Sequence, residues 1–250
     1  MELAMELVRM NIRLYLSSEQ TCNYLEQEES RSLFVDPAIK INSSLISQLS
    51  QNGFRRNGSL LYRPHCNHCN KCMSCRVICR DFKPSNSQKK ILRKAKLLDW
   101  KLVPMKFTQE HYYLYQKYIE ARHIDGDMYP ASEQQYQSFL ICGDIPQLLL
   151  EIRTSEGLLI CGAAVDCLDD GFSAVYSYFD PDFSQLSLGK LIILRLIEHC
   201  QSSQLAYVYL GYWIENCRKM AYKKNYPPME FFNRKQWISE PVNHNADMDL

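Results

Sequence analysis

The order of the apolar segments after residue 146 constrains the fold of this chain most. Three runs rich in β-branched and aromatic residues predict strands, at 147–153, 158–168 and 172–179. The turn Asp169-Asp170-Gly171 joins the last two as a tight hairpin. The next run, LGKLIILRLIEHC, has the length of a helix but is too apolar for the surface, so we expect it to pack on the sheet. A strand over 206–213 and a helix over 214–226 complete the predicted order.

Three antiparallel strands, a buried helix, a strand and a helix form the order of the acyltransferase fold called GNAT. The sequence therefore predicts an α+β fold with two domains. A cysteine-rich N-terminal domain, residues 1–105, should precede a GNAT-like acyltransferase domain, residues 106–237, which has a mixed sheet and flanking helices. We expect the polar residues 238–250 to form a disordered tail.

The start of the predicted central helix argues against a nucleotide cofactor. Acetyl-coenzyme A enzymes of this fold hold pyrophosphate on a Q/R-x-x-G-x-G/A loop, where free backbone N–H groups and the helix dipole attract anions. The equivalent stretch here, QLSLGKL, has one glycine and lacks the second. An enzyme that uses acetyl-coenzyme A is therefore disfavoured.

Composition limits the class of protein. Hydrophobic residues at 46% and charged residues at 23% are globular values. No apolar run reaches about 18 residues, and charged residues interrupt the start of the chain, so we expect no membrane span and no signal peptide. The expected compartment is the cytoplasm, where the 11 cysteines would be reduced thiols or metal ligands.

The formal net charge of +1 conceals an uneven distribution of charge along the chain. Between Arg55 and Lys96 there are twelve lysines and arginines and a single acid, Asp81, which gives a local balance of +11. Such segregation predicts a basic surface that faces a polyanion, although a solvated helix face also explains a run of lysines. Arginines mixed with aromatic residues, as in GFRRNGSLLYRP, favour a nucleic acid.

Five cysteines crowd the stretch HCNHCNKCMSCRVIC, which we expect to be irregular. Four of them, Cys69, Cys72, Cys75 and Cys79, have the C-x2-C-x2-C-x3-C spacing of a bacterial ferredoxin cluster, although Arg80 replaces the customary proline. Reduced cysteines without a metal are the alternative.

Several longer motifs are specific enough to indicate a family. They are TCNYL, GFRRNGSLLYRP, CNHCNKC, PSNSQKK, ARHIDGDM, AVYSYFDPDF, SLGKLIIL and YVYLGYWIENCRKMAYK, and they extend from about Cys22 to Glu230. In these motifs the chain closely resembles the bacterial aminoacyl-tRNA–protein transferases, specifically the aspartate/glutamate leucyltransferases, which are related to the eukaryotic arginyltransferases of the N-degron pathway. It departs from them where Ile124 and Asp127 replace the family's usual proline and glycine.

The resemblance implies a reaction and its partners. A leucyl group would move from leucyl-tRNA onto the α-amine of a protein that begins with Asp or Glu, which creates a degradation signal. Two alternatives remain open at this point. One is an arginyl donor on the same scaffold, and the other is a zinc- or nucleic-acid-binding module without enzyme activity.

The resemblance also favours a different set of metal ligands. The family motifs contain Cys22, Cys66, Cys69 and Cys72, whereas Cys75 and Cys79 replace the family's usual valines. Four thiolates suit tetrahedral zinc or an iron–sulfur cluster, and the eukaryotic relatives are reported to bind such a cluster in this domain. The resemblance therefore implies zinc or an iron–sulfur cluster on the four family cysteines.

The implied chemistry needs a base for the α-ammonium, a donor for the developing oxyanion and a proton for the leaving ribose oxygen. Asp180 of YFDPD lies at a predicted strand end and is the candidate base, although an aspartate before a proline also caps turns. Tyr176 and Tyr212 are candidate oxyanion donors. His123 and Asp125 form a candidate proton-handling pair, or simply a helix end and the turn after it.

The acidic side chain of the acceptor requires a cationic partner, and the planar fork of arginine suits a carboxylate better than lysine does. The candidates in family motifs are Arg56, Arg63 and Arg76, each of which could contact the tRNA instead. Lys219 and Lys223 are four residues apart on a predicted helix, where they could hold a phosphate or a carboxylate.

Three further candidates concern the end of the tRNA. Ser187, two residues before Gly189 at the start of the central helix, either caps this helix or contacts the terminal adenosine. Trp213 either stacks on the terminal base or is a buried residue of its strand.

Overall fold

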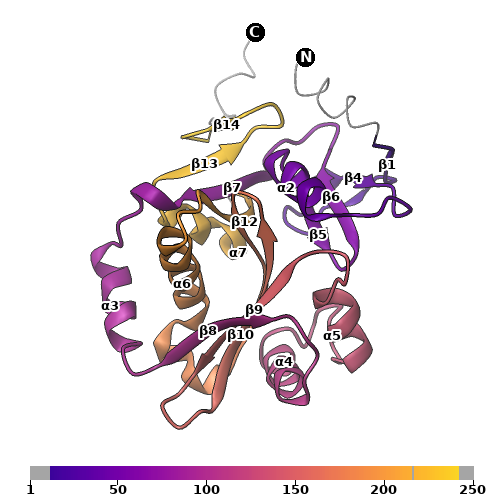
Figure 1. Cartoon of the computed structure of the whole chain (residues 1–250). Helices are drawn as coiled ribbons and strands as arrows, with labels where there is room; N and C mark the ends of the chain where they lie inside the picture. Colours follow the sequence, from indigo (N-terminus) through magenta and orange to yellow (C-terminus); the bar gives the residue numbers. More distant parts are fainter. Residues whose placement is uncertain (1–11, 216, 242–250) are drawn as a thin grey trace.

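An eight-stranded mixed sheet organises the structure, a computed structural model that describes residues 12–215 and 217–241 (Figure 1). The strand order is β14-β13-β7-β12-β11-β10-β9-β8, in which β11 and β12 run parallel and all other neighbours are antiparallel. The strands are β7 (Met73–Ile78), β8 (Asp99–Pro104), β9 (Gln147–Arg153), β10 (Leu159–Leu168), β11 (Gly171–Phe179), β12 (Tyr207–Trp213), β13 (Met229–Phe232) and β14 (Trp237–Ile238). The predicted strands of the second half and the mixed α+β fold are confirmed.

The sheet extends across the boundary that the sequence predicts after residue 105. Both β7 and β8 precede this boundary, yet they pair with β12 and β9 of the second half. The cysteine-rich stretch is also not irregular throughout. Cys75 and Val77 are fully buried in β7, so this stretch forms an inner strand of the sheet.

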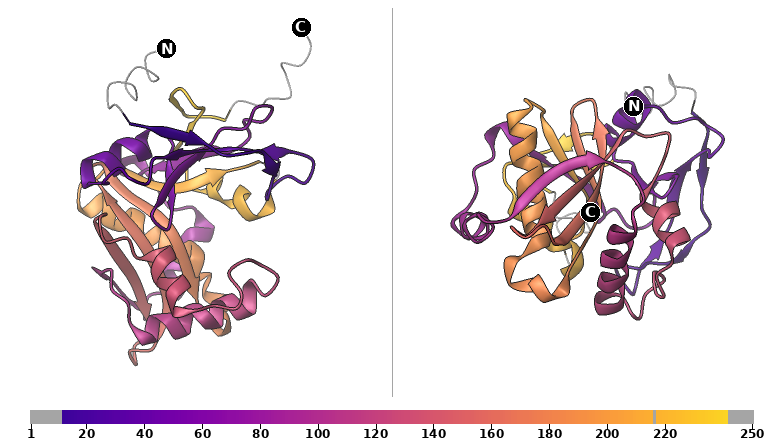
Figure 2. Two further views of the ribbon diagram at one scale, coloured as in Figure 1. Left: turned by 90° about the vertical axis from the view of Figure 1, so that its right-hand side faces the viewer. Right: turned by 60° about the horizontal axis from the view of Figure 1, so that its bottom comes forward.

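A second, smaller sheet lies beside one end of the large sheet (Figure 2). Its order is β1-β4-β6-β5, and it consists of β1 (Leu14–Leu16), β4 (Ser32–Val35), β6 (Leu60–Pro64) and β5 (Arg55–Asn57). A short ladder of β2 (Gln20–Thr21) and β3 (Glu29–Ser30) accompanies it. Helix α2 (Ser43–Gln51) joins this part to the large sheet, because Leu49 shares a buried cluster with Phe54 of the N-terminal part and Tyr209 of β12.

Helices cover both faces of the large sheet. On one face, α6 (Leu188–Ser202) packs against β11 and β12, and α3 (Asn86–Lys94) lies outside it. On the other face lie α4 (Gln109–Arg122) and α5 (Glu133–Leu140). The short elements are η1 (Cys79–Asp81), η2 (Pro181–Leu186), α7 (Arg218–Ala221) and η3 (Tyr222–Asn225). The predicted apolar helix is confirmed as α6, whereas the helix expected over 214–226 is only the short pair α7 and η3.

The alternation of side chains along β10 explains the two hydrophobic cores. Cys161, Ala163 and Val165 belong to the core that includes α6, whereas Ala164 belongs to the core of α4 and α5. The second core is unusually aromatic, with Tyr115, Tyr136 and Tyr178 all fully buried. The sheet is therefore buried on both faces.

The parallel strands β11 and β12 separate soon after they meet. They pair only where Gly171–Ser173 faces Tyr207–Tyr209, and β11 then continues to Phe179 while β12 continues to Trp213. Between the separated halves, backbone groups that would pair in a continuous sheet face each other across a gap. This gap is the place where a binding site can form in the middle of the sheet.

Two predictions from the sequence concern the ends of the chain and its relation to a membrane. Most of the predicted tail, residues 242–250, lies outside the described residues, as do residues 1–11 and 216. Within the described part of the chain, no helix has both the length and the apolar character needed to cross a membrane.

Candidate functional site

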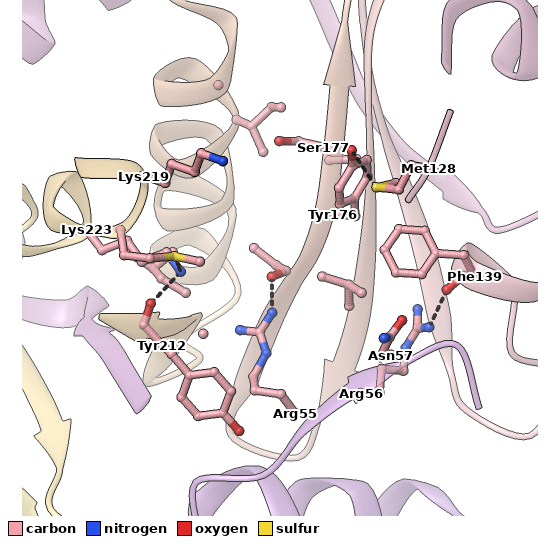
Figure 3. Close-up of a pocket in the computed structure, with 18 of the residues that line it drawn as sticks. Arg55, Arg56, Asn57, Met128, Phe139, Tyr176, Ser177, Tyr212, Lys219 and Lys223 are labelled. Atoms are coloured by element: carbon pink, nitrogen blue, oxygen red, sulfur yellow. Dashed lines mark hydrogen bonds between the residues drawn. The ribbon is translucent and has the colours of Figure 1, made fainter. Parts of the chain in front are cut away.

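A cavity of about 740 Å³ occupies the gap between β11 and β12 (Figure 3). One side is formed by residues 174–177 of β11, and the other by residues 210–212 of β12. Most of the remaining lining comes from strands β5 and β6, helices α5 and α6, the segment after α4 and the α7–η3 segment. The lining includes residues from both the N-terminal part and the large sheet, so neither part forms the cavity alone.

Arg55 of β5 reaches into the middle of this cavity (Figure 3). Its Nη2 donates a hydrogen bond to the carbonyl oxygen of Ala174 at 2.8 Å, which satisfies one of the backbone groups left free where β11 leaves β12. Its Nη1 is buried and has no hydrogen-bond partner among the described residues. Arg55 was not among the sequence candidates.

Two lysines lie on the α7–η3 side of the cavity (Figure 3). Lys223 is buried, and its Nζ donates to the carbonyl oxygen of Tyr212 at 2.7 Å. Burial, with a smaller contribution from Arg55, lowers the pKa of Lys223 from 10.5 to about 8. Lys219 also lines the cavity but is exposed. Both lysines thus line one cavity, and their binding of a phosphate or a carboxylate stays a prediction.

Lys223→Met is expected to stabilise the protein by about 1–2 kcal/mol at pH 7. A pKa lowered from 10.5 to about 8 corresponds to a cost of about 3 kcal/mol for the charged form, part of which the lost bond to Tyr212 offsets. Because the folded state holds the proton less tightly, stability of the unsubstituted protein falls as the pH drops from 10.5 towards 8 and is constant below. The gain should therefore shrink as the pH rises above about 8. Urea unfolding at several pH values measures it.

The matched control for this measurement is Lys224→Met, which removes the neighbouring, exposed lysine. It should leave stability unchanged within about 0.5 kcal/mol. A gain for Lys223→Met that is absent at pH 7, or that does not depend on pH, would show that Lys223 is not a charge held in a desolvated position.

The wall formed by α5 and β11 is apolar and aromatic. Phe139 and Tyr176 pack edge to face with ring centroids 5.0 Å apart, and Met128 lies beside them. The hydroxyl of Tyr176 donates only to the sulfur of Met128, at 3.6 Å, and burial raises the pKa of Tyr176 above its usual range. This hydroxyl is therefore neutral and still able to donate a stronger hydrogen bond to a ligand oxygen.

Tyr212, the second candidate oxyanion donor, also lines the cavity but has a different environment. Its hydroxyl lies within 3.2 Å of the carbonyl oxygen of Gly53 and 3.0 Å of that of Tyr62, so its proton is held by the N-terminal part. Burial raises the pKa of Tyr212 well above its usual value. The arrangement gives Tyr212 the role of joining the two parts of the chain.

His123 lines the cavity at the C-terminal end of α4. Burial lowers the pKa of His123, and the nearby charges of Lys219 and Arg122 lower it further. The imidazole is therefore neutral at pH 7 and can accept a proton. Asp125, its suggested partner, is exposed and is not part of the cavity lining.

Arg56, a candidate for the acceptor's carboxylate, has its guanidinium group occupied by the protein. Its Nε lies 2.8 and 2.9 Å from the two carboxylate oxygens of Asp166, and its Nη atoms donate to backbone carbonyls of Gly58, Phe139 and Leu140. The side chains of the pair are 1% and 3% exposed. Arg56 touches the cavity, but every nitrogen of its guanidinium is used within the protein.

Arg63 and Arg76 lie outside the cavity lining. Arg63 donates to the carbonyl oxygen of Asn52 and lies over the ring of Phe54. Arg76 is buried in β7, where it pairs with Glu230 and stacks on the rings of Tyr207 and Trp237. The structure thus does not bring the three arginine candidates together at one site.

Asp180, the candidate base, is also not part of the cavity lining. Its Oδ1 accepts a hydrogen bond from the backbone N–H of Asp182 and lies 2.7 Å from the Nζ of Lys117. These contacts are those of an aspartate that caps the 3-10 helix η2. The turn-capping alternative therefore describes its position better than a role beside the cavity.

Of the three candidates for binding the end of the tRNA, only one lines the cavity. Gly189 lines the cavity, whereas Ser187 does not; the backbone of Ser187 is left-handed with a φ of 55°, and its side chain makes no cap hydrogen bond. Trp213 is buried against Phe231 and is not part of the cavity lining. The core interpretation of Trp213 fits this position.

The basic segment from Arg55 to Lys96 does not form one continuous surface. Arg56 and Arg76 are buried in ion pairs, and Arg55 points into the cavity. The exposed cations are Lys71, Arg80, Lys83, Lys89, Lys90, Arg93, Lys94 and Lys96, of which the last five lie on or next to α3. The positive charge of this segment therefore has two parts, which are an exposed basic surface along α3 and buried cations that make contacts inside the protein.

The family cysteines lie in one neighbourhood of the N-terminal part. Burial is the main cause that raises the pKa of Cys72 to about 12, and the thiols of Cys69, Cys22 and Cys66 raise it further. Cys75 and Cys79 are fully buried in and after β7. Within residues 12–215 and 217–241, no three His, Cys, Asp or Glu side chains are arranged to hold a metal ion.

A local signal in the sequence points to the pair Arg55 and Arg56 but does not distinguish between them. Neighbouring side chains on a strand point to opposite sides, so only one of Arg55 and Arg56 can face a given site. The structure pairs Arg56 with Asp166, a buried acid 110 residues away. No local pattern indicates that partner, and so none tells which of the two arginines is free.

The comparisons with known proteins agree with one another. The profile of the family described as "Arginine-tRNA-protein transferase, N terminus" matches residues 20–90, and the profile described as "Arginine-tRNA-protein transferase, C terminus" matches residues 110–233. A protein of Saccharophagus degradans named aspartate/glutamate leucyltransferase is 44% identical over 91% of this chain and 97% of its own length. A protein of Marinobacter nauticus with the same name is 46% identical over 86% of this chain and 91% of its own length.

Among solved structures, L-PGS from Bacillus licheniformis is similar with a TM-score of 0.46 and 8% identity, over 57% of this chain and 45% of that chain. The matches in sequence cover both walls of the cavity, from β5 in the N-terminal profile to β11, β12 and α7 in the C-terminal one. The chain is therefore a member of the arginine-tRNA-protein transferase family, and it is an enzyme of the aminoacyltransferase class.

Proposed function

We propose that this enzyme transfers leucine from leucyl-tRNA to the N-terminal α-amine of proteins that begin with Asp or Glu, and so creates an N-terminal degradation signal. The observation that carries the proposal is the division of the cavity between β11 and β12. One wall is apolar, with Met128, Phe139 and Tyr176, and the other carries the cations of Arg55, Lys219 and Lys223. An apolar wall suits a leucyl side chain, and a cationic wall suits an acidic acceptor.

The charges of the cavity favour leucine over arginine as the transferred residue. Among the described residues that line it, the only carboxylate is that of Asp127, which is exposed. A cationic arginyl side chain would meet Arg55, Lys219 and Lys223 without a buried counter-ion. The arginyl alternative is for this reason the weaker of the two.

The proposed chemistry uses the groups that face the cavity. Neutral His123 accepts a proton from the acceptor's α-ammonium, and the amine nitrogen attacks the carbonyl carbon of the leucyl ester. Tyr176 donates a hydrogen bond to the oxyanion that develops. The bond between the carbonyl carbon and the ribose oxygen then breaks, and the second proton of the nitrogen passes to that oxygen. The products are a new peptide bond and a deacylated tRNA.

The GNAT-like architecture belongs to the same proposal. Support comes from the strand order of the large sheet and from the parallel pair β11 and β12, which separates to form the cavity. We further propose that the tRNA lies along the exposed cations of α3, because neutralised phosphates supply much of the affinity for tRNA. Zinc or an iron–sulfur cluster on Cys22, Cys66, Cys69 and Cys72 remains a proposal for elemental analysis, and no step above passes through a metal.

Purified protein, leucyl-tRNA and a peptide that begins with Asp should yield a peptide that begins with Leu-Asp. Mass spectrometry of the peptide measures the product. Arginyl-tRNA should give little product in the same assay, because the cavity offers its side chain no buried acid, and acetyl-coenzyme A should give none. Transfer of arginine without leucine would reverse the assignment of the donor. No transfer from either tRNA to any peptide would reject the proposed function.

A further inference from the structure

We infer that Arg55 binds the side-chain carboxylate of the acceptor's first residue and so selects acidic N-termini. The inference rests on the proposed function and goes beyond it, because it assigns the acidic preference to one side chain at one place. Arg55 approaches from β5 of the N-terminal part and ends between the two separated strands of the large sheet (Figure 3).

The hydrogen bonds of Arg55 leave part of its fork free. Nη2 is fixed by the carbonyl oxygen of Ala174 at 2.8 Å, whereas Nη1 is buried without a partner among the described residues. A buried donor without an acceptor is costly, and such groups are rare in folded proteins. The guanidinium is therefore anchored through Nη2, and a carboxylate that enters the cavity would supply the acceptor that the buried Nη1 lacks.

Arg55 has no direct ionic partner within the described part of the protein, although burial raises the pKa of the nearby Asp166 and the charge of Arg55 is one of those that oppose this rise. No carboxylate in the described ranges forms an ion pair with Arg55. Asp166, a buried acid, pairs instead with Arg56. Its Oδ1 also accepts a hydrogen bond at 3.1 Å from Nε2 of Gln147. Lys223 lines the same cavity and adds a second positive charge. An incoming carboxylate would therefore supply the missing negative charge in a desolvated place, where charge-assisted bonds are strong.

Gly211 of β12 leaves room for the guanidinium of Arg55 because it has no side chain. Its backbone has a φ of 81°, which side chains rarely adopt, and a Cβ at this position would lie 2.6 Å from Nη1 and 2.8 Å from Cζ of Arg55. The opposite side of the fork is set by Ala174 of β11. The site is thus formed by three segments that hold the fork in one place, and not by a mobile arginine at the surface.

A phosphate of the tRNA is the other anion that could meet an arginine in this enzyme. A phosphodiester is flanked by two nucleotides, whereas the free Nη1 of Arg55 is buried between strands. A side-chain carboxylate on a short stem reaches such a position more readily. The exposed cations of α3 are more suitable for phosphates.

The test compares acceptor peptides that differ only in their first residue. Initial rates of leucyl transfer are measured with peptides that begin with Asp or Asn, which have nearly the same shape, and with Glu or Gln. For the unsubstituted enzyme, kcat/KM should favour the acid by roughly a hundredfold or more. For Arg55→Gln this ratio should fall to within about tenfold of unity, mainly through a higher KM for the acidic peptide. Arg55→Lys keeps the charge but not the fork, and should give an intermediate ratio.

Two further measurements separate this role from others. Affinity for leucyl-tRNA should stay within about threefold in both variants, and the matched control Arg195→Gln should keep the acid-to-amide ratio. Arg195 lies on α6, pairs with Glu198 and does not line the cavity. If Arg55→Gln does not fold, as judged by circular dichroism, Arg55→Lys alone decides through its ratio.

Two outcomes would overturn the inference while the proposed function stands. One is an acid-to-amide ratio in the folded Arg55 variants equal to that of the unsubstituted enzyme. The other is a loss of affinity for leucyl-tRNA with an unchanged ratio, which would assign Arg55 to a phosphate. Failure of the unsubstituted enzyme to transfer leucine to any peptide would instead reject the proposed function.

Discussion

Gly211→Ala is expected to lower leucyl transfer to an acidic peptide by about a hundredfold. A methyl group at this position would lie 2.6 Å from Nη1 of Arg55, well inside contact distance. The guanidinium must therefore leave the position from which we infer that it binds the acceptor's carboxylate. The left-handed backbone adds a cost in stability of about 1–2 kcal/mol, which a domain with a stability of about 5–15 kcal/mol tolerates without unfolding. Initial rates with saturating leucyl-tRNA and limiting peptide measure the loss.

The matched control is Gly143→Ala. Gly143 has no heavy atom within 4 Å of an added Cβ, and its φ is not left-handed. This variant should keep both stability and activity. The two substitutions add the same methyl group, and so a difference between them reports the environment of Gly211.

A double-mutant cycle shows whether Gly211→Ala acts through Arg55. If the methyl group only displaces the guanidinium, adding Gly211→Ala to Arg55→Gln should lower the transfer rate by less than about threefold more. Losses that multiply would mean that Gly211 affects the site by another route, for example through the backbone of β12. Full activity of Gly211→Ala would contradict the proposed position of the acceptor.

The second half of the fold is largely predictable from local sequence. The strands β9, β10 and β11 and the helix α6 are continuous apolar segments, and both the hairpin turn and the length of each run are local features. The N-terminal contribution to the large sheet is not predictable in this way. Strand β7 is buried on both faces, so Cys75 and Val77 pack as core residues, whereas the spacing of the cysteines in and around β7 resembles that of a metal site.

The candidate site is less predictable, because its members come from distant segments. The motifs identify Tyr176, Lys219 and Lys223 as lining residues, since each lies in a conspicuous stretch near the end of a strand or on a helix. Choosing between Arg55 and Arg56 requires knowledge of where Asp166 lies. That depends on how β5 packs against the large sheet, and no periodicity within GFRRNG contains this information.

Asp180 illustrates the same limit. Its motif ends a strand, and the gap between β11 and β12 opens farther back along that strand, at Ala174. The position at which two parallel strands separate depends on their pairing. A motif that follows the strand therefore indicates the neighbourhood of the site but not its lining.

Arg56→Met is expected to lower the free energy of unfolding by about 3–5 kcal/mol. The substitution leaves Asp166 in a place that is 3% exposed with only Gln147 as a polar partner, and a buried charge without its counter-ion is strongly destabilising. Burial already raises the pKa of Asp166 although Arg56 opposes this effect. Thermal unfolding should show a fall of about 10 °C in Tm for a chain of this size. Replacing both partners, as in Arg56→Met with Asp166→Leu, should recover much of the loss, because the remaining cost is that of the backbone carbonyls that Arg56 served.

The control is Arg80→Met, which removes an arginine that is 86% exposed and pairs only with its neighbour Asp81. Its effect on stability should stay within about 0.5 kcal/mol. The same variants distinguish the roles of the two adjacent arginines. Below its unfolding transition, Arg56→Met should keep the preference for Asp over Asn at the acceptor's first position, since its guanidinium serves the fold, whereas Arg55→Gln should lose that preference and stay folded. If Arg56→Met has normal stability but no longer prefers Asp over Asn, then Arg56, and not only Arg55, binds the acceptor's carboxylate.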